Sequence, residues 1–87
     1  MRYILVVVGA ITSTTRLGTV LEKNGCKNIN IIRTPIVISS GGCSYSLKMD
    51  EKDIDVLRSV TASRRFRIKK IYSVNDSGQE CEYNDIS

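Results

Sequence analysis

The chain has 87 residues, with 13 Lys and Arg against 9 Asp and Glu, and its formal net charge is +4. This length supports one hydrophobic core, so the sequence predicts one small domain and argues against a two-lobed enzyme. The chain has no histidine and no Cys-x-x-Cys pair, which removes the usual zinc and iron–sulfur ligand sets and the Ser/His and Cys/His nucleophile pairs. We therefore expect neither a metal site nor a hydrolase.

The N-terminal third of the chain shows a strand pattern followed by a helix pattern. The apolar run at residues 1–8 stops after about half the length that a membrane helix needs. Its continuous, β-branched part at residues 3–8 predicts a strand buried on both faces. Thr12 or Ser13 is predicted to cap a helix over about residues 14–24. Gly25 stands where the left-handed C-terminal cap of such a helix belongs.

The middle of the chain contains two further strand patterns joined by a flexible connection. Residues 29–33 predict a strand that ends at Thr34-Pro35, because proline cannot donate a hydrogen bond to a sheet. The Ser-Ser-Gly-Gly-Cys segment at residues 39–43 then leads into residues 45–49. The alternation of apolar and polar side chains there predicts a strand with one wet face.

The last third predicts a helix, a strand and a tail. Asp50 is predicted to cap a helix that ends near Ser63, and residues 66–74 show the last strand pattern. Residues 75–87 lack periodicity and are predicted to be a disordered acidic tail. The order β-α-β-β-α-β predicts an α+β, ferredoxin-like domain over residues 1–74, with a four-stranded antiparallel sheet and both helices on one face.

Cysteine is the residue type that offers this chain covalent chemistry. The three cysteines are odd in number and widely spaced, and no secretion signal is recognisable, so we expect reduced thiols in a cytoplasmic protein. Cys26 follows a helix cap and is interpreted as a buried hydrophobic residue. Cys81 lies in the acidic tail, where negative charges oppose thiolate formation. Cys43 is therefore the candidate reactive residue.

The predicted topology gives Cys43 a setting that favours an anion. Its loop should share one rim of the sheet with the start of the first helix and with the turn into the last strand. Backbone N–H groups, hydroxyls and guanidinium groups at that rim would stabilise a thiolate. The supporting residues are Thr12, Ser13, Gly41, Gly42, Arg64 and Arg65.

Several segments resemble a known family. They are Leu21-Glu22-Lys23-Asn24-Gly25, Arg33-Thr34-Pro35, Ser39-Ser40-Gly41-Gly42-Cys43 leading into Tyr45-Ser46-Leu47-Lys48, Asp50-Glu51-Lys52-Asp53, and Ile71-Tyr72. Through them, residues 1–74 resemble the selenium/sulfur carrier-like protein family of small bacterial and archaeal domains. The Thr-Pro followed by a Ser- and Gly-rich loop and a cysteine is the most specific part. Family members typically read Cys-Gly after this loop, whereas Ser44 follows Cys43 here.

The resemblance implies a carrier protein rather than a self-contained enzyme. Such a carrier would hold sulfur or selenium on Cys43 as a persulfide or selenopersulfide and would pass it to an acceptor protein. Its partners would be sulfur or selenium donor and acceptor proteins, without a membrane and without a cofactor. Association of the chain with itself stays open.

Two other functions also stay open. Residues 1–74 carry all thirteen basic side chains and five acidic ones, a formal charge of +8, and residues 64–70 read Arg-Arg-Phe-Arg-Ile-Lys-Lys. This balance allows a module that binds nucleic acid or another anion. Nucleic acid is disfavoured, because the predicted central strands offer only Tyr3 and Tyr45 for stacking bases. The third possibility is a structural or regulatory domain that binds proteins through its sheet and does no chemistry.

Overall fold

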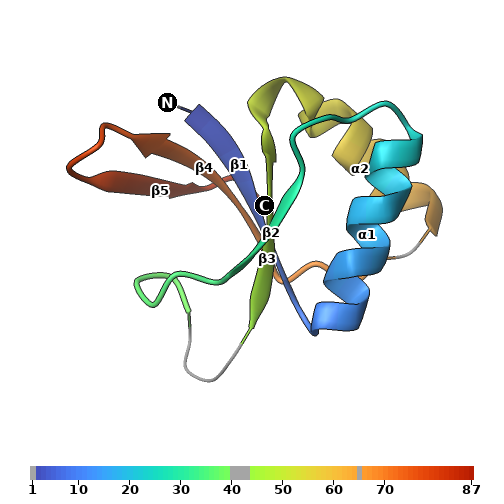
Figure 1. Cartoon of the computed structure of the whole chain (residues 1–87), viewed down its shortest axis with the longest axis horizontal. Coiled ribbons are helices and arrows are strands. Elements are labelled where there is room, and N and C mark those ends of the chain that lie inside the picture. The colour runs from blue at the N-terminus through green and yellow to red at the C-terminus, as the bar shows by residue number, and fades with distance from the viewer. Residues whose placement is uncertain (1, 40–43, 65) are drawn as a thin grey trace.

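The computed structural model of the chain describes residues 2–39, 44–64 and 66–87. These residues form an antiparallel sheet of five strands in the order β2-β3-β1-β4-β5, with two α-helices and the short 3-10 helix η1 (Figure 1). The elements are β1 (Arg2–Gly9), α1 (Ile11–Lys23), β2 (Asn30–Arg33), β3 (Tyr45–Asp50), η1 (Glu51–Asp53), α2 (Ile54–Arg64), β4 (Lys70–Asp76) and β5 (Cys81–Asp85).

The prediction of a four-stranded ferredoxin-like sheet is wrong, because the C-terminal segment adds a fifth strand. β5 lies antiparallel beside β4 over five residue pairs. The prediction that this segment is disordered is wrong for the same reason. Tyr83 lies opposite the fully buried Val74, and its ring meets that of Tyr72 edge to face at 6.3 Å. The α+β class and the antiparallel direction of the sheet agree with the prediction.

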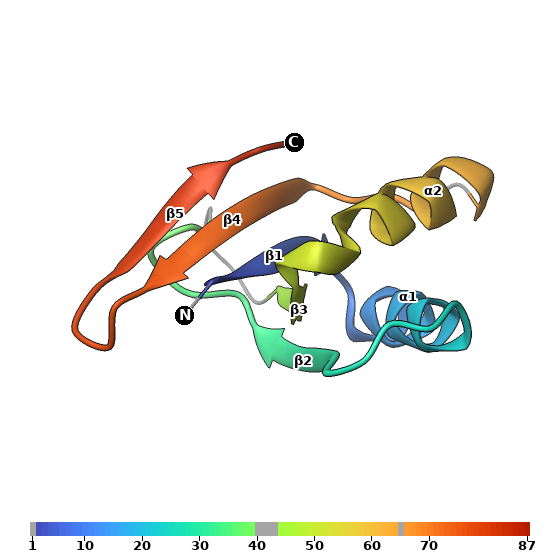
Figure 2. The ribbon, with the colours of Figure 1, turned by 90° about the horizontal axis from the view of Figure 1, so that it is seen from above.

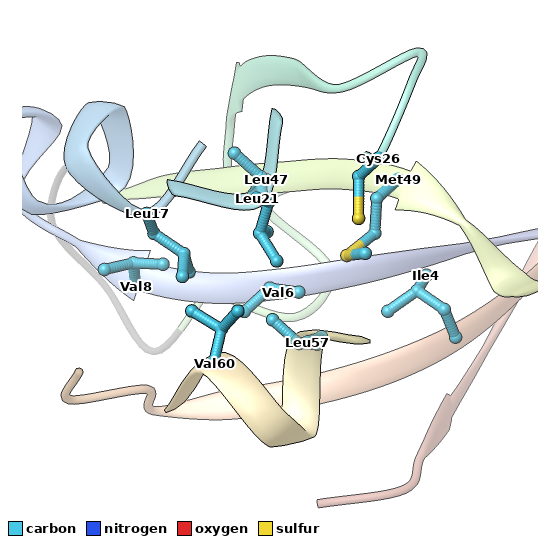
Figure 3. Close-up of a cluster of buried hydrophobic side chains, with 10 residues drawn as sticks. All are labelled: Ile4, Val6, Val8, Leu17, Leu21, Cys26, Leu47, Met49, Leu57 and Val60. Carbon is cyan, nitrogen blue, oxygen red and sulfur yellow. The ribbon is translucent and has the colours of Figure 1, made fainter. Parts of the chain in front are cut away.

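Both helices cover the same face of the sheet (Figure 2). Alternate side chains of β1 point toward them and join a core with side chains from α1, α2 and β3 (Figure 3). This core comprises Ile4, Val6, Val8, Leu17, Leu21, Cys26, Leu47, Met49, Leu57 and Val60. Tyr3 and Leu5 belong to a second cluster with Val74, against which Ile38 packs. β1 is thus buried on both faces, as its continuous apolar run predicts.

The start of α1 differs from the prediction. The helix begins at Ile11, its N-cap is Ala10, and no side chain caps it, so the prediction of a cap at Thr12 or Ser13 is wrong. The hydroxyl of the fully buried Thr14 donates instead to the carbonyl oxygen of Ala10, at 2.8 Å. Hydroxyl residues can bond back within a helix as well as cap it, and Thr14 bonds back to the residue at the N-cap.

The end of α1 follows its prediction. Gly25 adopts a φ of 93°, a conformation that L-residues disfavour. Its N–H donates to the carbonyl of Glu22, and the N–H of Cys26 donates to the carbonyl of Leu21, both at 3.1 Å. These are the two hydrogen bonds of a Schellman motif. Cys26 and Leu21 also share the core, so the cap turns the chain back toward the sheet.

Candidate functional site

The edge of the sheet that is formed by one set of strand ends, and not by an outer strand, brings together the segments that the sequence predicts to be neighbours. Gly9 at the end of β1 lies opposite Tyr45 at the start of β3, and Val7 lies opposite Lys70 at the start of β4. The register shifts between Val7 and Gly9, which is a bulge, and Val8 remains in the helix-covered core. The start of α1, the start of β3 and the approach to β4 therefore meet at this edge.

The connection between β2 and β3 leaves the sheet at the same edge and is tied at its base. The N–H of Thr34 donates to the carbonyl oxygen of Ser44 at 2.9 Å. The hydroxyls of Thr34 and Ser46 are 2.6 Å apart, and both residues are buried. Between them, residues 35–39 form a turn in which the N–H groups of Ile38 and Ser39 donate to the carbonyl of Pro35. These hydrogen bonds join the residue after β2 to the start of β3, so they hold the two ends of the loop together.

The structure brings two of the predicted supporting residues together. Ser13, in the first turn of α1, and Arg64, at the end of α2, line the same cleft. Thr12 is exposed in the first turn of α1 and does not line it. The remaining predicted site residues lie outside the described residues: Gly41, Gly42, Cys43 and Arg65.

The cleft has a volume of about 830 Å³ and lies between α1 and the segment that joins α2 to β4. Of the residues that the structure describes, those that line it are Val8, Ala10, Ser13, Arg16, Val20, Arg64, Phe66, Arg67, Ile68 and Lys69. Four of these are cations and none is a carboxylate. We name it the basic cleft. The basic run at residues 64–70 is visible in the sequence and forms one side of the cleft. Arg16 lies far from this run in the sequence and reaches the cleft because α1 forms the other side.

The other two cysteines occupy contrasting environments. Cys26 is 4% exposed and lies beside Met49 in the core (Figure 3). Burial raises the pKa of its thiol, and the negative charge of Asp53 adds to the effect. Cys26 is therefore a buried hydrophobic residue, as interpreted from the sequence. Cys81 is exposed on β5.

Tyrosine side chains gather around Cys81 on the sheet face opposite the helices. Burial raises the pKa of both Tyr3 and Tyr83, and the nearby Cys81 side chain raises both further. The Lys48 ammonium lies 4.4 Å from the centre of the Tyr3 ring, a cation–π contact. Tyr3 therefore offers its ring to a lysine of its own chain.

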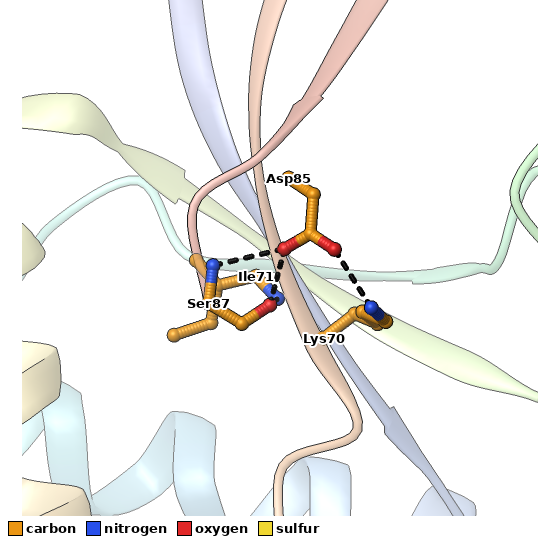
Figure 4. Close-up of polar contacts among 4 residues, drawn as sticks. All are labelled: Lys70, Ile71, Asp85 and Ser87. Atoms are coloured by element: carbon orange, nitrogen blue, oxygen red, sulfur yellow. Dashed lines mark hydrogen bonds and ion pairs between the residues drawn. The ribbon is translucent and has the colours of Figure 1, made fainter.

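An ion pair joins β4 to β5 (Figure 4). The Lys70 ammonium lies 2.7 Å from a carboxylate oxygen of Asp85, and the N–H and hydroxyl of Ser87 donate to the other oxygen. Together these donors hold the pKa of Asp85 well below its usual range. Lys70 is therefore engaged at the edge of the sheet, although it belongs to the basic run of the sequence.

The family that the sequence resembles is confirmed by comparison with protein families. The model of the family described as "Putative Se/S carrier protein-like" matches residues 3–73, and the chain therefore belongs to this family. The match includes the loop that carries Cys43 and ends before β5. Comparisons with curated proteins and with solved structures give no match. Among the helices of the described residues, none is long and apolar enough to span a membrane.

Proposed function

We propose that the protein carries sulfur or selenium on Cys43 and passes it to an acceptor protein. The observation that carries this proposal is the family match, which spans residues 3–73 and so includes the cysteine-bearing loop. The buried setting of Cys26 supports it, since a buried thiol with a raised pKa is a poor nucleophile. A reducing cytoplasm suits the proposal, because the carrier cysteine has to start as a thiolate.

The loading step is an exchange between a thiolate and a persulfide. The Cys43 thiolate attacks the outer sulfur of a donor protein's persulfide, a new S–S bond forms on Cys43, and the donor cysteine leaves as its thiolate. In delivery, an acceptor nucleophile attacks the outer sulfur and Cys43 leaves as thiolate. Selenium would follow the same path as a selenopersulfide. Each step moves one chalcogen atom without net oxidation, so no cofactor is needed.

The basic cleft supports this role electrostatically. Arg64 lines the cleft together with Ala10, which follows Gly9, and Gly9 lies opposite Tyr45, where the chain re-enters the sheet after the loop between β2 and β3. A cation near a thiolate or a persulfide stabilises its negative charge and lowers the pKa of the sulfur. Arg64→Gln should therefore slow alkylation of Cys43 near neutral pH by about 3- to 10-fold, which corresponds to a pKa rise of roughly 0.5–1 unit. Arg58→Gln is the matched control, because Arg58 is exposed on the same helix and does not line the cleft.

Mass spectrometry after treatment with a cysteine desulfurase and cysteine tests the carrier proposal directly. The reduced chain should gain one sulfur atom on Cys43, and a thiol reductant should remove it as sulfide. Cys43→Ser should abolish loading while the midpoint of thermal unfolding stays unchanged, and Cys81→Ser should load like the wild type. Equal loading of Cys43 and the exposed Cys81 would instead mean that exposure alone governs the reaction, and the proposal would fail.

A further inference from the structure

We propose that the basic cleft binds a phosphate-bearing small molecule of about nucleotide size. The proposal rests on the shape, charge and floor of the cleft, all of which come from described residues. It does not depend on thiol chemistry at Cys43, so it can be true or false independently of the carrier function.

Charge is the first argument. Arg16 approaches from α1, and Arg64, Arg67 and Lys69 approach from the end of α2 and the segment before β4. Among the described residues, no carboxylate lines the cleft. The neighbouring Lys70 pairs with Asp85 and does not line it. Four like charges around one concavity repel one another, and a multivalent anion removes that repulsion. Three of the four are arginines, whose planar guanidinium groups suit the oxygens of phosphate.

The position of Lys69 is fixed by the backbone on which it sits. Its N–H donates to the carbonyl oxygen of Val7 at 2.8 Å. Its side chain passes over Gly9, where a Cβ atom would lie 3.4 Å from the lysine Cε. Gly9 has a φ of 120° beside the bulge that ends β1. The missing side chain at Gly9 therefore leaves room for the lysine stem beside the end of β1.

The floor and size of the cleft indicate more than a bare phosphate ion. Val8, Val20, Phe66 and Ile68 give it an apolar lining, and Phe66 and Ile68 are half-buried because they pack against the core. Its volume of about 830 Å³ lies within the usual range of small-molecule sites. The arrangement suits a ligand with phosphate at the cationic wall and a planar or apolar body over Phe66.

Binding of inorganic pyrophosphate, ADP and adenosine at constant ionic strength tests the proposal by calorimetry and by amide chemical shifts. Pyrophosphate should bind and should shift the amide signals of Ser13 and Lys69. ADP should bind about tenfold more tightly than pyrophosphate, because its base can use the apolar floor, and adenosine should not bind measurably. Added salt should weaken the binding of both pyrophosphate and ADP. The Cys43→Ser chain should behave like the wild type, which separates this result from the fate of the carrier proposal.

Two variants locate the site. Arg16→Gln with Arg67→Gln should weaken pyrophosphate binding about 100-fold, since each arginine contributes about tenfold through a charged hydrogen bond. The matched control is Arg2→Gln with Arg58→Gln, which changes the net charge equally at exposed positions outside the cleft and should leave binding within about twofold. Phe66→Leu should abolish the advantage of ADP while pyrophosphate binding stays unchanged.

Several outcomes would overturn the proposal. The first is no pyrophosphate binding at about 1 mM, the level at which binding is already weak. The second is equal loss of binding in the control pair, which would mean that net charge alone matters. The third is a single-stranded RNA that binds far more tightly than ADP with a steep salt dependence, which would show that the cleft is part of a nucleic-acid surface.

Discussion

Replacement of Gly25 by alanine tests how much the cap of α1 contributes to the fold. Gly25 has a φ of 93°, and a Cβ atom built there would meet no other atom within 4 Å. The cost is therefore a backbone cost alone. An L-residue in this region costs roughly 1–2 kcal/mol, and the smaller entropy of unfolded alanine returns about 0.4–1 kcal/mol. We expect Gly25→Ala to lower the free energy of unfolding by about 1 kcal/mol, which lowers the unfolding midpoint by roughly 4–8 °C in a chain of this size.

Thermal unfolding followed by circular dichroism measures this effect, and alkylation of Cys26 gives a local readout. The N–H of Cys26 belongs to the same cap, so loosening the cap should speed its modification. Gly25→Asn should be less destabilising than Gly25→Ala, because asparagine tolerates positive φ better. A chemically synthesised chain with D-alanine at this position should be at least as stable as the wild type. An L-alanine variant as stable as the wild type, or an asparagine variant less stable than the alanine variant, would refute the reasoning.

The burial of Cys26 and the ion pair of Asp85 each predict a measurable effect. In the folded protein near neutral pH, iodoacetamide should modify Cys81 much faster than Cys26, because Cys26 is 4% exposed and burial raises its pKa; similar rates by mass spectrometry would contradict the burial. Lys70 and Ser87 lower the pKa of Asp85, so their stabilising effect is present above about pH 4 and is lost as the pH falls through the lowered value. Asp85→Asn should therefore reduce the fall of the unfolding midpoint on acidification below about pH 4. An unchanged acid limb would show that this ion pair does not couple to unfolding.

The parts of the fold that the sequence predicted correctly are those with strong local signals. The run at residues 3–8 is apolar at every position and is too short to cross a membrane as a helix, which favours a strand buried on both faces. Gly25 follows the C-cap residue Asn24 and adopts the positive φ that makes glycine favourable there. Both signals depend on neighbouring residues alone, so the rest of the molecule did not have to be known.

The errors occurred where a distant segment decides the local structure. β5 carries one large apolar side chain, Tyr83, and becomes a strand because β4 offers it a partner and Val74 a surface. A strand stabilised by pairing leaves little trace in its own periodicity. Thr12 and Ser13 are good capping residues, but the helix begins before them, at Ile11, with Ala10 as its N-cap.

For the candidate site, too, one part could be predicted from the sequence and the other depends on the tertiary structure. The sequence by itself determined the chemistry that is available: one loop cysteine in a family-specific segment, and a basic run at residues 64–70. Only the tertiary structure decided which groups meet, placing Ser13 and Arg64 in one cleft and adding Arg16 from a helix far away in the sequence. The same structure turned Lys70 toward Asp85 and out of that group. The charge of a side chain is known from its residue type, whereas a binding site depends on which side chains lie close together. For residues that are far apart in the sequence, strand pairing and helix packing set those distances.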